Sequence, residues 1–464
     1  MVVPIAAVTA VLHCVAGILG KDYWFDEVYM LAIGRKHLDW GSADQPPVAP
    51  ALAAMMDTLA PGSLIALRIP AVFATAGAVV LAALIARELG CDRRAQGFTA
   101  AAQATAIWTA LAGHWLTPYS LEPVQWLLLV WLLVRWIRLR EDRLLLAAGV
   151  VVGIAALTKF QVVVLCVVLL AAVAAVGPRE LLRRPMLWVG AGVAVLIAAP
   201  TLLWQAGHGW PQLQMAPVVA GEAEALYGGR ASIAVQIIAF AGVAGVALML
   251  YGLWRLRDPQ MRDYRFLGVT FAVLFVLFVA TAGRPYYLAG LYAPLAAVGA
   301  LGLQQRRLAG TVRRRWLVWP VYAASAALAV ATVALSVMIV DDETGERIVA
   351  QAADAFHQLP DEQRDRTVLI GESYIVAAYA DGYADRYDLP QAFSTSRSYG
   401  YFPPPSEDRD TALFIGRAPD ALRPFFAEVR VVGDVGDEMR AYLMTERREP
   451  WDRIWSQTRT LTVS

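Results

Sequence analysis

Two adjacent carboxylates follow the first apolar stretch of the chain, in the segment KDYWFDEVYM, where they are Asp26 and Glu27. A third, Glu122, stands at the start of a later apolar stretch. A carboxylate held near a hydroxyl group can remove its proton as a general base. Because ionisable residues at bilayer depth are costly, and usually face a cavity or a partner, each of the three is a candidate for function.

Basic and aromatic residues lie at comparable positions next to other apolar stretches. A phosphate that departs from carbon gains negative charge, and fixed cations lower the barrier to that step. Carboxylates together with such cations indicate sugar transfer from a lipid-phosphate donor, whose lipid chain would lie in the bilayer and whose headgroup would lie at its boundary. The candidate residues for binding the phosphate or the sugar are Arg68, Lys159, Arg284, Tyr286 and Tyr287.

Each of these residues also has a purely structural interpretation. Arg68 and Lys159 could reach toward lipid headgroups with their long side chains. Glu122 could stabilise the N-terminus of its helix. Aromatic residues such as Tyr286 and Tyr287 often anchor a span at the membrane interface. The functional interpretation gains weight because the residues come from distant parts of the sequence and the predicted topology puts them at one boundary.

The elements that must position these residues are membrane spans. The chain has 464 residues, of which 58% are hydrophobic and 17% charged, and its mean hydropathy is positive. Runs of about twenty apolar residues are typical of transmembrane helices. The sequence therefore predicts a mainly α, polytopic membrane protein with about eleven spans, at 3–20, 65–88, 96–112, 121–138, 144–158, 160–176, 186–205, 231–254, 266–282, 286–304 and 316–339.

Arginine-rich loops give the orientation of the spans. Five of them, CDRRAQ, RLREDR, GPRELLRR, RLRDPQMRDYR and QQRRLAGTVRRR, fall on alternate connections, and such loops are usually cytoplasmic. We therefore predict a multi-pass plasma-membrane protein with a cytoplasmic N-terminus. The loop that carries Asp26, Glu27 and Gln45 then lies outside, in a catalytic first external loop at 21–64, and the domain that contains the spans covers 1–340.

The composition changes after the last predicted span. Residues 341–464 contain no long apolar run and combine a polar helical stretch with strand-like runs TVLIG, TALFIG and VRVVGDV. These patterns predict a small α/β domain, which the topology puts outside the cell. The domain lacks a glycine-rich phosphate-binding motif, so nothing in it predicts nucleotide binding.

Several classes of protein are disfavoured. A net charge of +1 is not the basic signature of a nucleic-acid-binding protein. The three cysteines are scattered and suggest neither a disulfide framework nor a metal cluster. His37, His114 and His208 are all expected in external loops, where they could hold a divalent metal together with Asp26 or Glu122. No pair has the spacing of metal ligands, so a catalytic metal is disfavoured. A transporter is disfavoured because the ionisable residues gather at one face rather than at the midplane.

The chain also resembles a known family. It is similar to the type C membrane glycosyltransferases of family 39, which include protein O-mannosyltransferases and the aminoarabinose transferase of lipid A, and in particular to an actinobacterial branch. The resemblance runs nearly end to end and rests on ordered blocks: FDEVYMLAIG, PPVAPALAAM, LRIPAVFA, YSLEPVQWLLL, AAGVVVGIAALTKF, PTLLWQAGHGWPQLQ, AGRPYYLAGLYAPLAAVGAL, IGESYIVAAYADGYADRYDLPQAFS and PWDRIWSQTRTL. It implies a GT-C fold and a polyprenyl-phosphate-linked sugar as donor substrate.

The resemblance assigns roles residue by residue. Asp26 matches the first-loop aspartate that the family uses as catalytic base, with Glu27 as its partner; adjacent helical residues point about 100° apart, so one of the two faces the acceptor, and Asp26 is preferred. Glu122 matches a second acidic position. Arg284 matches a basic residue before PYYL and is the first candidate for the lipid phosphate, ahead of Lys159 and Arg68. His208 and Trp210 belong to the block HGWP, which lines a substrate pocket.

Two positions depart from the family pattern. Relatives carry a lysine or histidine before the proline pair where this chain has Gln45, and glutamine cannot neutralise a phosphate. Relatives tend to have Asn-Tyr where this chain has Ser373 followed by Tyr374. The expected reaction is an inverting displacement that moves a sugar to an envelope acceptor, which is a protein, a glycan or a lipid. The alternative is a non-catalytic scaffold protein of the cell envelope that binds lipid-linked sugar.

Overall fold

The computed structural model describes residues 1–310, 316, 318–340, 343–436 and 438–463. The arginines at 313–315, which belong to one predicted cytoplasmic loop, and the first two residues of the predicted external domain, 341 and 342, lie outside the described residues. The chain divides into two compact units. Unit 1 comprises residues 1–19, 67–203 and 219–338, and unit 2 comprises residues 20–66, 204–218 and 339–464.

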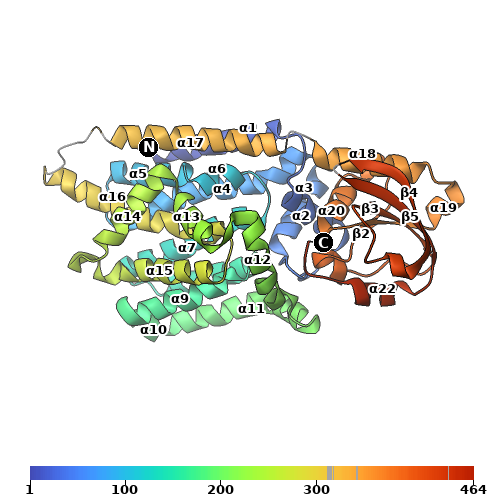
Figure 1. Ribbon diagram of the computed structural model, residues 1–464. Helices are drawn as coiled ribbons and strands as arrows, with labels where there is room; N and C mark the ends of the chain where they lie inside the picture. The colour runs from blue at the N-terminus through green and yellow to red at the C-terminus, as the bar shows by residue number, and fades with distance from the viewer. Residues whose placement is uncertain (311–315, 317, 341–342, 437, 464) are drawn as a thin grey trace. The chain divides into compact units, whose positions relative to one another are not determined.

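Unit 1 is helical (Figure 1). Its boundaries with unit 2 fall inside α4, α11, α12 and the last turn of α17. Its α-helices, and the 3-10 helices η1 and η2, are α1 (Val2–Leu19), α4 (Leu64–Glu88), α5 (Arg93–Ala104), α6 (Ile107–Ala112), α7 (Pro118–Leu139), α8 (Arg143–Ala156), α9 (Gln161–Val176), α10 (Glu180–Arg183), α11 (Pro185–Gly207), α12 (Pro211–Tyr227), α13 (Gly229–Ala239), α14 (Gly242–Arg255), η1 (Pro259–Tyr264), α15 (Arg265–Ala280), η2 (Pro285–Leu291), α16 (Tyr292–Leu308) and α17 (Val318–Ile339).

Length and composition make this a multi-pass membrane protein. Seven helical segments of the described chain are long and apolar enough to cross a membrane, and the bent pair α13 and α14 makes an eighth if it is one span. Three further predicted spans fall on shorter helices: α5 and α6 share one, and α8 and α9, of 14 and 16 residues, take one each. The eleven predicted spans therefore correspond to seven long helical segments, one bent helix pair and three stretches of shorter helix among the described residues.

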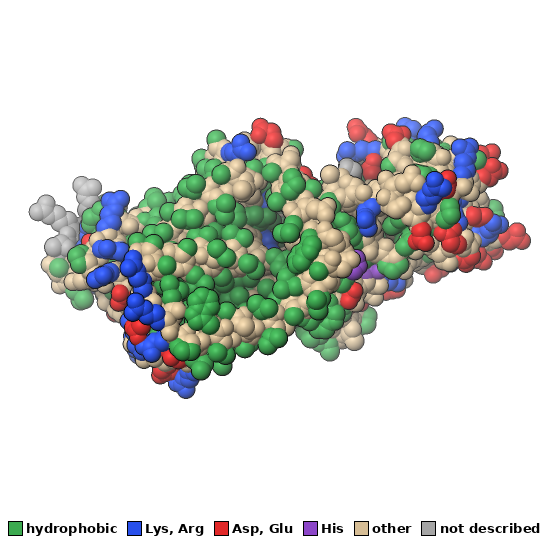
Figure 2. Space-filling model, turned by 90° about the horizontal axis from the view of Figure 1, so that it is seen from below, with side chains coloured by type: hydrophobic (Ala, Val, Ile, Leu, Met, Phe, Trp, Pro, Cys, Tyr) green, Lys and Arg blue, Asp and Glu red, His purple; other side chains and the backbone are tan. Residues whose placement is uncertain are grey.

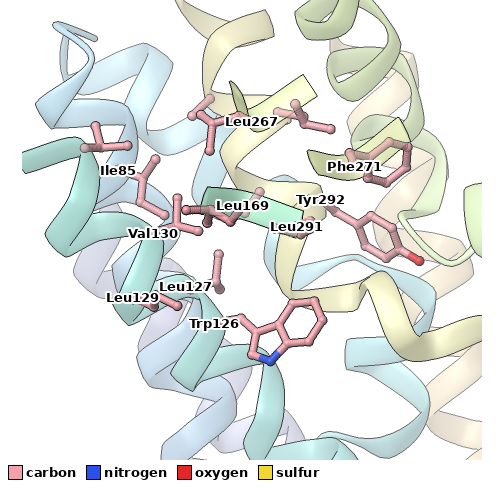
Figure 3. Packing of buried hydrophobic residues seen from close by; sticks show 14 of the residues in the cluster. Ile85, Trp126, Leu127, Leu129, Val130, Leu169, Leu267, Phe271, Leu291 and Tyr292 are labelled. Carbon is pink, nitrogen blue, oxygen red and sulfur yellow. The ribbon is translucent and has the colours of Figure 1, made fainter. Parts of the chain in front are cut away.

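Close packing inside unit 1 joins its helices. A buried hydrophobic cluster includes Trp126, Leu169 and Phe271, from α7, α9 and α15 (Figure 3). Gly252 of α14 and Gly299 of α16 lie where the two backbones approach, because a Cβ added at either would collide with a backbone carbonyl of the other helix. Small residues permit such approach between membrane helices. Figure 2 shows hydrophobic side chains spread over one face of this unit, with lysine and arginine gathered at one end.

Unit 2 combines helices with one mixed five-stranded sheet. Its elements are α2 (Phe25–Lys36), α3 (Val48–Leu59), α18 (Thr344–His357), α19 (Asp361–Asp365), β1 (Thr367–Gly371), α20 (Tyr374–Gly382), α21 (Ala384–Tyr387), β2 (Ala392–Phe393), η4 (Arg397–Tyr401), β3 (Thr411–Gly416), η5 (Arg423–Phe425), β4 (Phe426–Gly436), β5 (Met439–Arg447) and α22 (Trp451–Thr458).

The sheet has the strand order β2-β1-β3-β5-β4. The first three strands are parallel, and β5 and β4 add an antiparallel edge. β1 and β3 read TVLIG and TALFIG and are buried along their whole length, as expected for parallel strands covered on both faces. Helix α2, from the loop after the first span, packs on α20. The acidic pair is therefore held by the same compact unit as the sheet.

Candidate functional site

The two adjacent carboxylates of α2 have different environments. Both lie in the first turn, where negative charge is favourable. Glu27 is fully buried, and its Oε2 accepts a hydrogen bond of 3.4 Å from the backbone N–H of Trp24. Asp26 is only half-buried. Glu27 thus stabilises the start of the helix, and Asp26 is the more exposed of the two carboxylates.

The loop with the proline pair is held by Asp44, the residue before Gln45. Its Oδ1 accepts hydrogen bonds from the hydroxyls of Tyr29, at 2.8 Å, and Ser398, at 2.5 Å. Its Oδ2 accepts one of 3.2 Å from Nε2 of Gln45. A guanidinium nitrogen of Arg397 lies 3.8 Å from the same Oδ2. A cation is therefore present within unit 2 beside the Gln-Pro-Pro segment, although Gln45 itself is neutral.

Arg397 was not predicted as a site residue. It follows a serine-rich loop, begins η4 with a φ of 53°, and is 7% exposed. Its guanidinium carbon also lies 5.6 Å from the centre of the Tyr374 ring. A polar loop carries no periodic pattern, so the sequence offers no signal that would place this arginine against Asp44.

The HGWP segment is supported by aromatic stacking. His208 stacks on Trp204, with ring centres 3.9 Å apart, and its Nδ1 lies 2.8 Å from the Trp204 carbonyl oxygen. Trp204 donates from Nε1 to Asp39, at 3.0 Å. Trp210 has a positive φ of 56° and is 41% exposed. His208 is thus tied to its own turn, and Trp210 presents its ring to solvent or to a partner.

In unit 1 the structure brings Glu122 and Lys159 together with the two tyrosines. Nζ of Lys159, between α8 and α9, lies 3.4 Å from Oε2 of Glu122 on α7. The same nitrogen lies 5.1 Å from the ring centre of Tyr286 and 4.3 Å from that of Tyr287. Glu122 is 5% exposed, and among the described residues its Oε1 has no hydrogen-bond partner. The four residues form a compact acid, base and aromatic cluster.

Arg284 has a partner that the sequence did not reveal. It forms an ion pair with Glu222 of α12, and its guanidinium carbon lies 5.4 Å from the centre of the Tyr227 ring. Arg284 is 9% exposed, and within the described part of the chain its Nη1 finds no acceptor. A buried guanidinium with an unused donor is suited to an additional anionic ligand.

Arg68 has a more structural environment. It is 1% exposed, and its Nη1 donates a hydrogen bond of 2.9 Å to the carbonyl oxygen of Gly17, near the end of α1. Close to it, the buried rings of His13 and His114 face each other with their Nδ1 atoms 3.4 Å apart. The side chain therefore satisfies a helix C-terminus, a role that basic residues commonly fill.

The described residues contain no group of side chains that could serve as a set of metal ligands. Within 1–310, 316, 318–340, 343–436 and 438–463, no three His, Cys, Asp or Glu side chains are grouped closely enough to hold an ion. The arrangement instead offers a half-buried carboxylate in unit 2 and two buried cation–carboxylate pairs in unit 1.

Comparison with solved structures identifies the class of fold. ArnT from Cupriavidus metallidurans bound to undecaprenyl phosphate aligns with a TM-score of 0.65 and 17% identity, over 95% of this chain and 97% of that one. An oligosaccharyltransferase from Archaeoglobus fulgidus, in complex with Zn and sulfate, aligns with a TM-score of 0.51 and 14% identity, over 81% of this chain and 61% of that one. AglB from the same organism, in complex with an inhibitory peptide and a dolichol-phosphate, aligns with a TM-score of 0.50 and 12% identity, over 91% of this chain and 70% of that one.

The fold is that of the GT-C membrane glycosyltransferases, as predicted. Residues 44–204 match the family model described as dolichyl-phosphate-mannose-protein mannosyltransferase. No curated protein matches the chain. The resemblance to this type of glycosyltransferase is thereby confirmed, and the actinobacterial branch stays a prediction.

Proposed function

We propose that this protein transfers a sugar from a polyprenyl-phosphate donor to an acceptor of the cell envelope, on the outer face of the plasma membrane. The observation that carries the proposal is the pair of buried ionic clusters in unit 1, Lys159 with Glu122 and Arg284 with Glu222. Burying such pairs costs free energy that an apolar core would not require. Stabilising the negative charge of a departing lipid phosphate would explain why the chain carries these cations.

The proposed donor lipid has support from fold relatives. ArnT from Cupriavidus metallidurans holds undecaprenyl phosphate, and AglB from Archaeoglobus fulgidus holds dolichol-phosphate. We extend this class of lipid to the present chain. Its phosphate would accept hydrogen bonds from the unused Nη1 of Arg284 and would be attracted by Lys159, while Tyr286 and Tyr287 frame the site.

The proposed reaction is a single displacement with inversion at the anomeric carbon. Asp26 takes the proton of the acceptor hydroxyl, whose oxygen forms the new bond to the sugar as the bond to the phosphate oxygen breaks. The electron pair leaves with the polyprenyl phosphate, which the cations stabilise. Glu27 holds the first turn of α2 so that Asp26 keeps its orientation, and Glu122 positions Lys159 or the sugar.

The missing lysine before the proline pair has a proposed substitute. Arg397 lies beside Asp44 and Gln45, so we assign it the positive charge that Gln45 lacks. The chain then keeps a cation in this part of unit 2, contributed by η4 rather than by the loop. His208 and Trp210 are proposed to line the pocket for donor or acceptor.

The test is a turnover assay on purified protein in lipid nanodiscs with radiolabelled polyprenyl-phosphate sugars and envelope acceptors. We expect release of polyprenyl phosphate, and we expect Asp26→Asn to abolish it. Asp388→Asn is the matched control, because Asp388 is exposed and has a positive φ that asparagine tolerates. Unchanged turnover in Asp26→Asn would reject the base assignment, and no turnover with any donor would favour the non-catalytic scaffold.

A further inference from the structure

The sheet of unit 2 has a topological switch point. After β1 the chain turns toward β2 on one side, and after β3 it turns toward β4 and β5 on the other. β1 and β3 are parallel neighbours, so their carboxyl ends lie side by side. In open α/β sheets, ligands bind in the crevice outside the carboxyl ends of strands at such a point.

A cavity of about 430 Å³ lies at this place, entirely within unit 2. Glu372 follows β1 directly, and Arg417 follows β3 directly; both line the cavity. Other walls come from the start of α20, the start of α18 and the segment before α2. A volume of this size is within the range of pockets that bind small molecules.

Some polar groups of the cavity wall already have hydrogen-bond partners in the protein, and others remain available to a ligand. Asp22 is used, because its Oδ2 accepts hydrogen bonds from two backbone N–H groups at the start of α18. The Tyr379 hydroxyl is used on the carbonyl oxygen of Tyr23. Oε2 of Glu372 accepts the backbone N–H of Arg417, at 3.2 Å. In the described chain, Oε1 of Glu372 and the guanidinium of Arg417 have no protein partner.

The apolar part of the wall is aromatic. Trp24 and Phe25 both line the cavity, and their ring centres are 4.4 Å apart. Two aromatic rings that line the same cavity as one carboxylate and one guanidinium suit a sugar. The C–H face of a sugar ring packs on aromatic carbon, and its hydroxyls donate to carboxylate and accept from guanidinium. Glu372 stands next to the N-terminus of α20, so its charge opposes a phosphate at the position where a helix would otherwise attract one.

We propose that this cavity binds a sugar unit of the acceptor, so that the acceptor is a glycan or a glycolipid. This proposal rests on the proposed function. Trp24 follows the last residue of α1, Leu19, by five positions, and Ile339, also in the wall, is the last residue of α17. The cavity is thus built partly from segments that leave membrane spans. The same sugar could be carried by a membrane glycolipid or by a soluble glycan chain.

The test is binding without donor, by saturation-transfer NMR on the full chain in nanodiscs. The probes are tetrasaccharides of mannose, galactose and arabinose, each free and as its octyl glycoside. We expect at least one sugar to bind. Binding of the octyl form alone assigns a glycolipid acceptor, and binding of both forms assigns a glycan chain. Binding of an octyl ether without sugar, or of a Ser/Thr-rich peptide in place of the sugars, would overturn the proposal.

Two conservative variants localise the binding. Glu372→Gln and Arg417→Gln should each weaken the sugar about tenfold or more, since each removes a charge-assisted hydrogen bond. Glu362→Gln and Arg423→Gln, at exposed positions of the same unit that do not line the cavity, should bind as the wild type does. Equal binding by all four variants, with unchanged thermal unfolding, would reject the site. Asp26→Asn should bind normally, so loss of turnover and loss of this site are separable.

Discussion

The two units treat buried charge differently. In unit 1, buried or partly buried carboxylates meet cations: Glu122 meets Lys159, Glu222 meets Arg284, and Glu88 meets Arg135 and Arg138. In unit 2, the buried carboxylates of Asp22, Asp381 and Glu27 accept hydrogen bonds from hydroxyls and backbone N–H groups, and Asp44 combines such hydroxyl donors with the nearby guanidinium of Arg397. Hydrocarbon surroundings require neutral pairs, whereas hydrogen bonds alone can hold a carboxylate in a water-facing domain.

This difference separates two chemical tasks. Carboxylates that accept hydrogen bonds from hydroxyls and backbone N–H groups are typical of unit 2, which also carries Asp26, the residue to which the proton transfer is assigned. Paired cations are already charged and fixed, which suits the binding of a phosphate in unit 1. The comparison can be tested by changing one partner of each kind and measuring activity and stability separately.

The largest effect is expected at the two adjacent acids of α2. Asp26→Asn should lower turnover by about 100-fold or more, the usual contribution of a general base, with little change in stability. Glu27→Ala should keep most activity and lower the free energy of unfolding by about 1 kcal/mol, because alanine cannot accept the hydrogen bond from the backbone N–H of Trp24. Turnover and thermal unfolding of both variants decide the matter. The reverse pattern would exchange the roles of the two residues.

The next effect concerns the pH dependence of unit 2, where two groups oppose each other. Burial raises the pKa of Asp381 to about 6, so its contribution to stability falls as pH rises from about 3.8 to 6. Burial, with some repulsion from Lys36, lowers the pKa of His37 to about 4, so its contribution falls as pH drops from 6.5 to 4. Each effect amounts to about 3 kcal/mol.

The opposite pH dependences that Asp381 and His37 give to the stability of unit 2 nearly cancel in the wild type, and each should become visible when the other residue is replaced. Asp381→Asn should leave a protein that loses stability on acidification from pH 6.5 to 4. His37→Gln should gain stability over the same change. Hydrogen-exchange protection of β1 and β3, corrected for the intrinsic pH dependence of exchange, measures both. Identical pH profiles for the two variants would show that these groups do not control the stability of unit 2.

A smaller effect is expected at the pair of Arg284 and Glu222. Arg284→Gln should raise the KM for donor about tenfold, through loss of a charged hydrogen bond, and should destabilise unit 1 by roughly 2 kcal/mol, because Glu222 loses its ion pair with Arg284 in a partly buried site. The double variant with Glu222→Gln should recover stability but not donor affinity. Arg93→Gln, an exposed change, is the control. Additive losses of stability would argue against a coupled pair.

The sequence predicted the features that depend on composition and local order. Apolar runs gave the spans, the buried strands β1 and β3 were recognisable, and Asp26 with Glu27 stood out because acids are rare beside a span. The ion-pair partners of the site residues could not be predicted, because Glu222 is 62 positions from Arg284 and Arg397 is in a loop without periodicity. The helices α8 and α9 coincide with two predicted spans, and their 14 and 16 residues are short for a membrane crossing.

The smallest effect is expected at Gln45, the position where relatives carry a cation. A lysine at 45 would stand beside Asp44 and Arg397 in unit 2, adding one positive charge near a carboxylate that currently accepts from Gln45. Gln45→Lys should lower the KM for donor roughly threefold, the size expected for one partly solvated charge, and should restore part of the activity lost in Arg397→Gln. Gln45→Met is the matched uncharged control. If Gln45→Lys leaves KM unchanged in both backgrounds, the Gln-Pro-Pro loop does not contact the donor phosphate, and the phosphate is held by the ionic pairs of unit 1 alone.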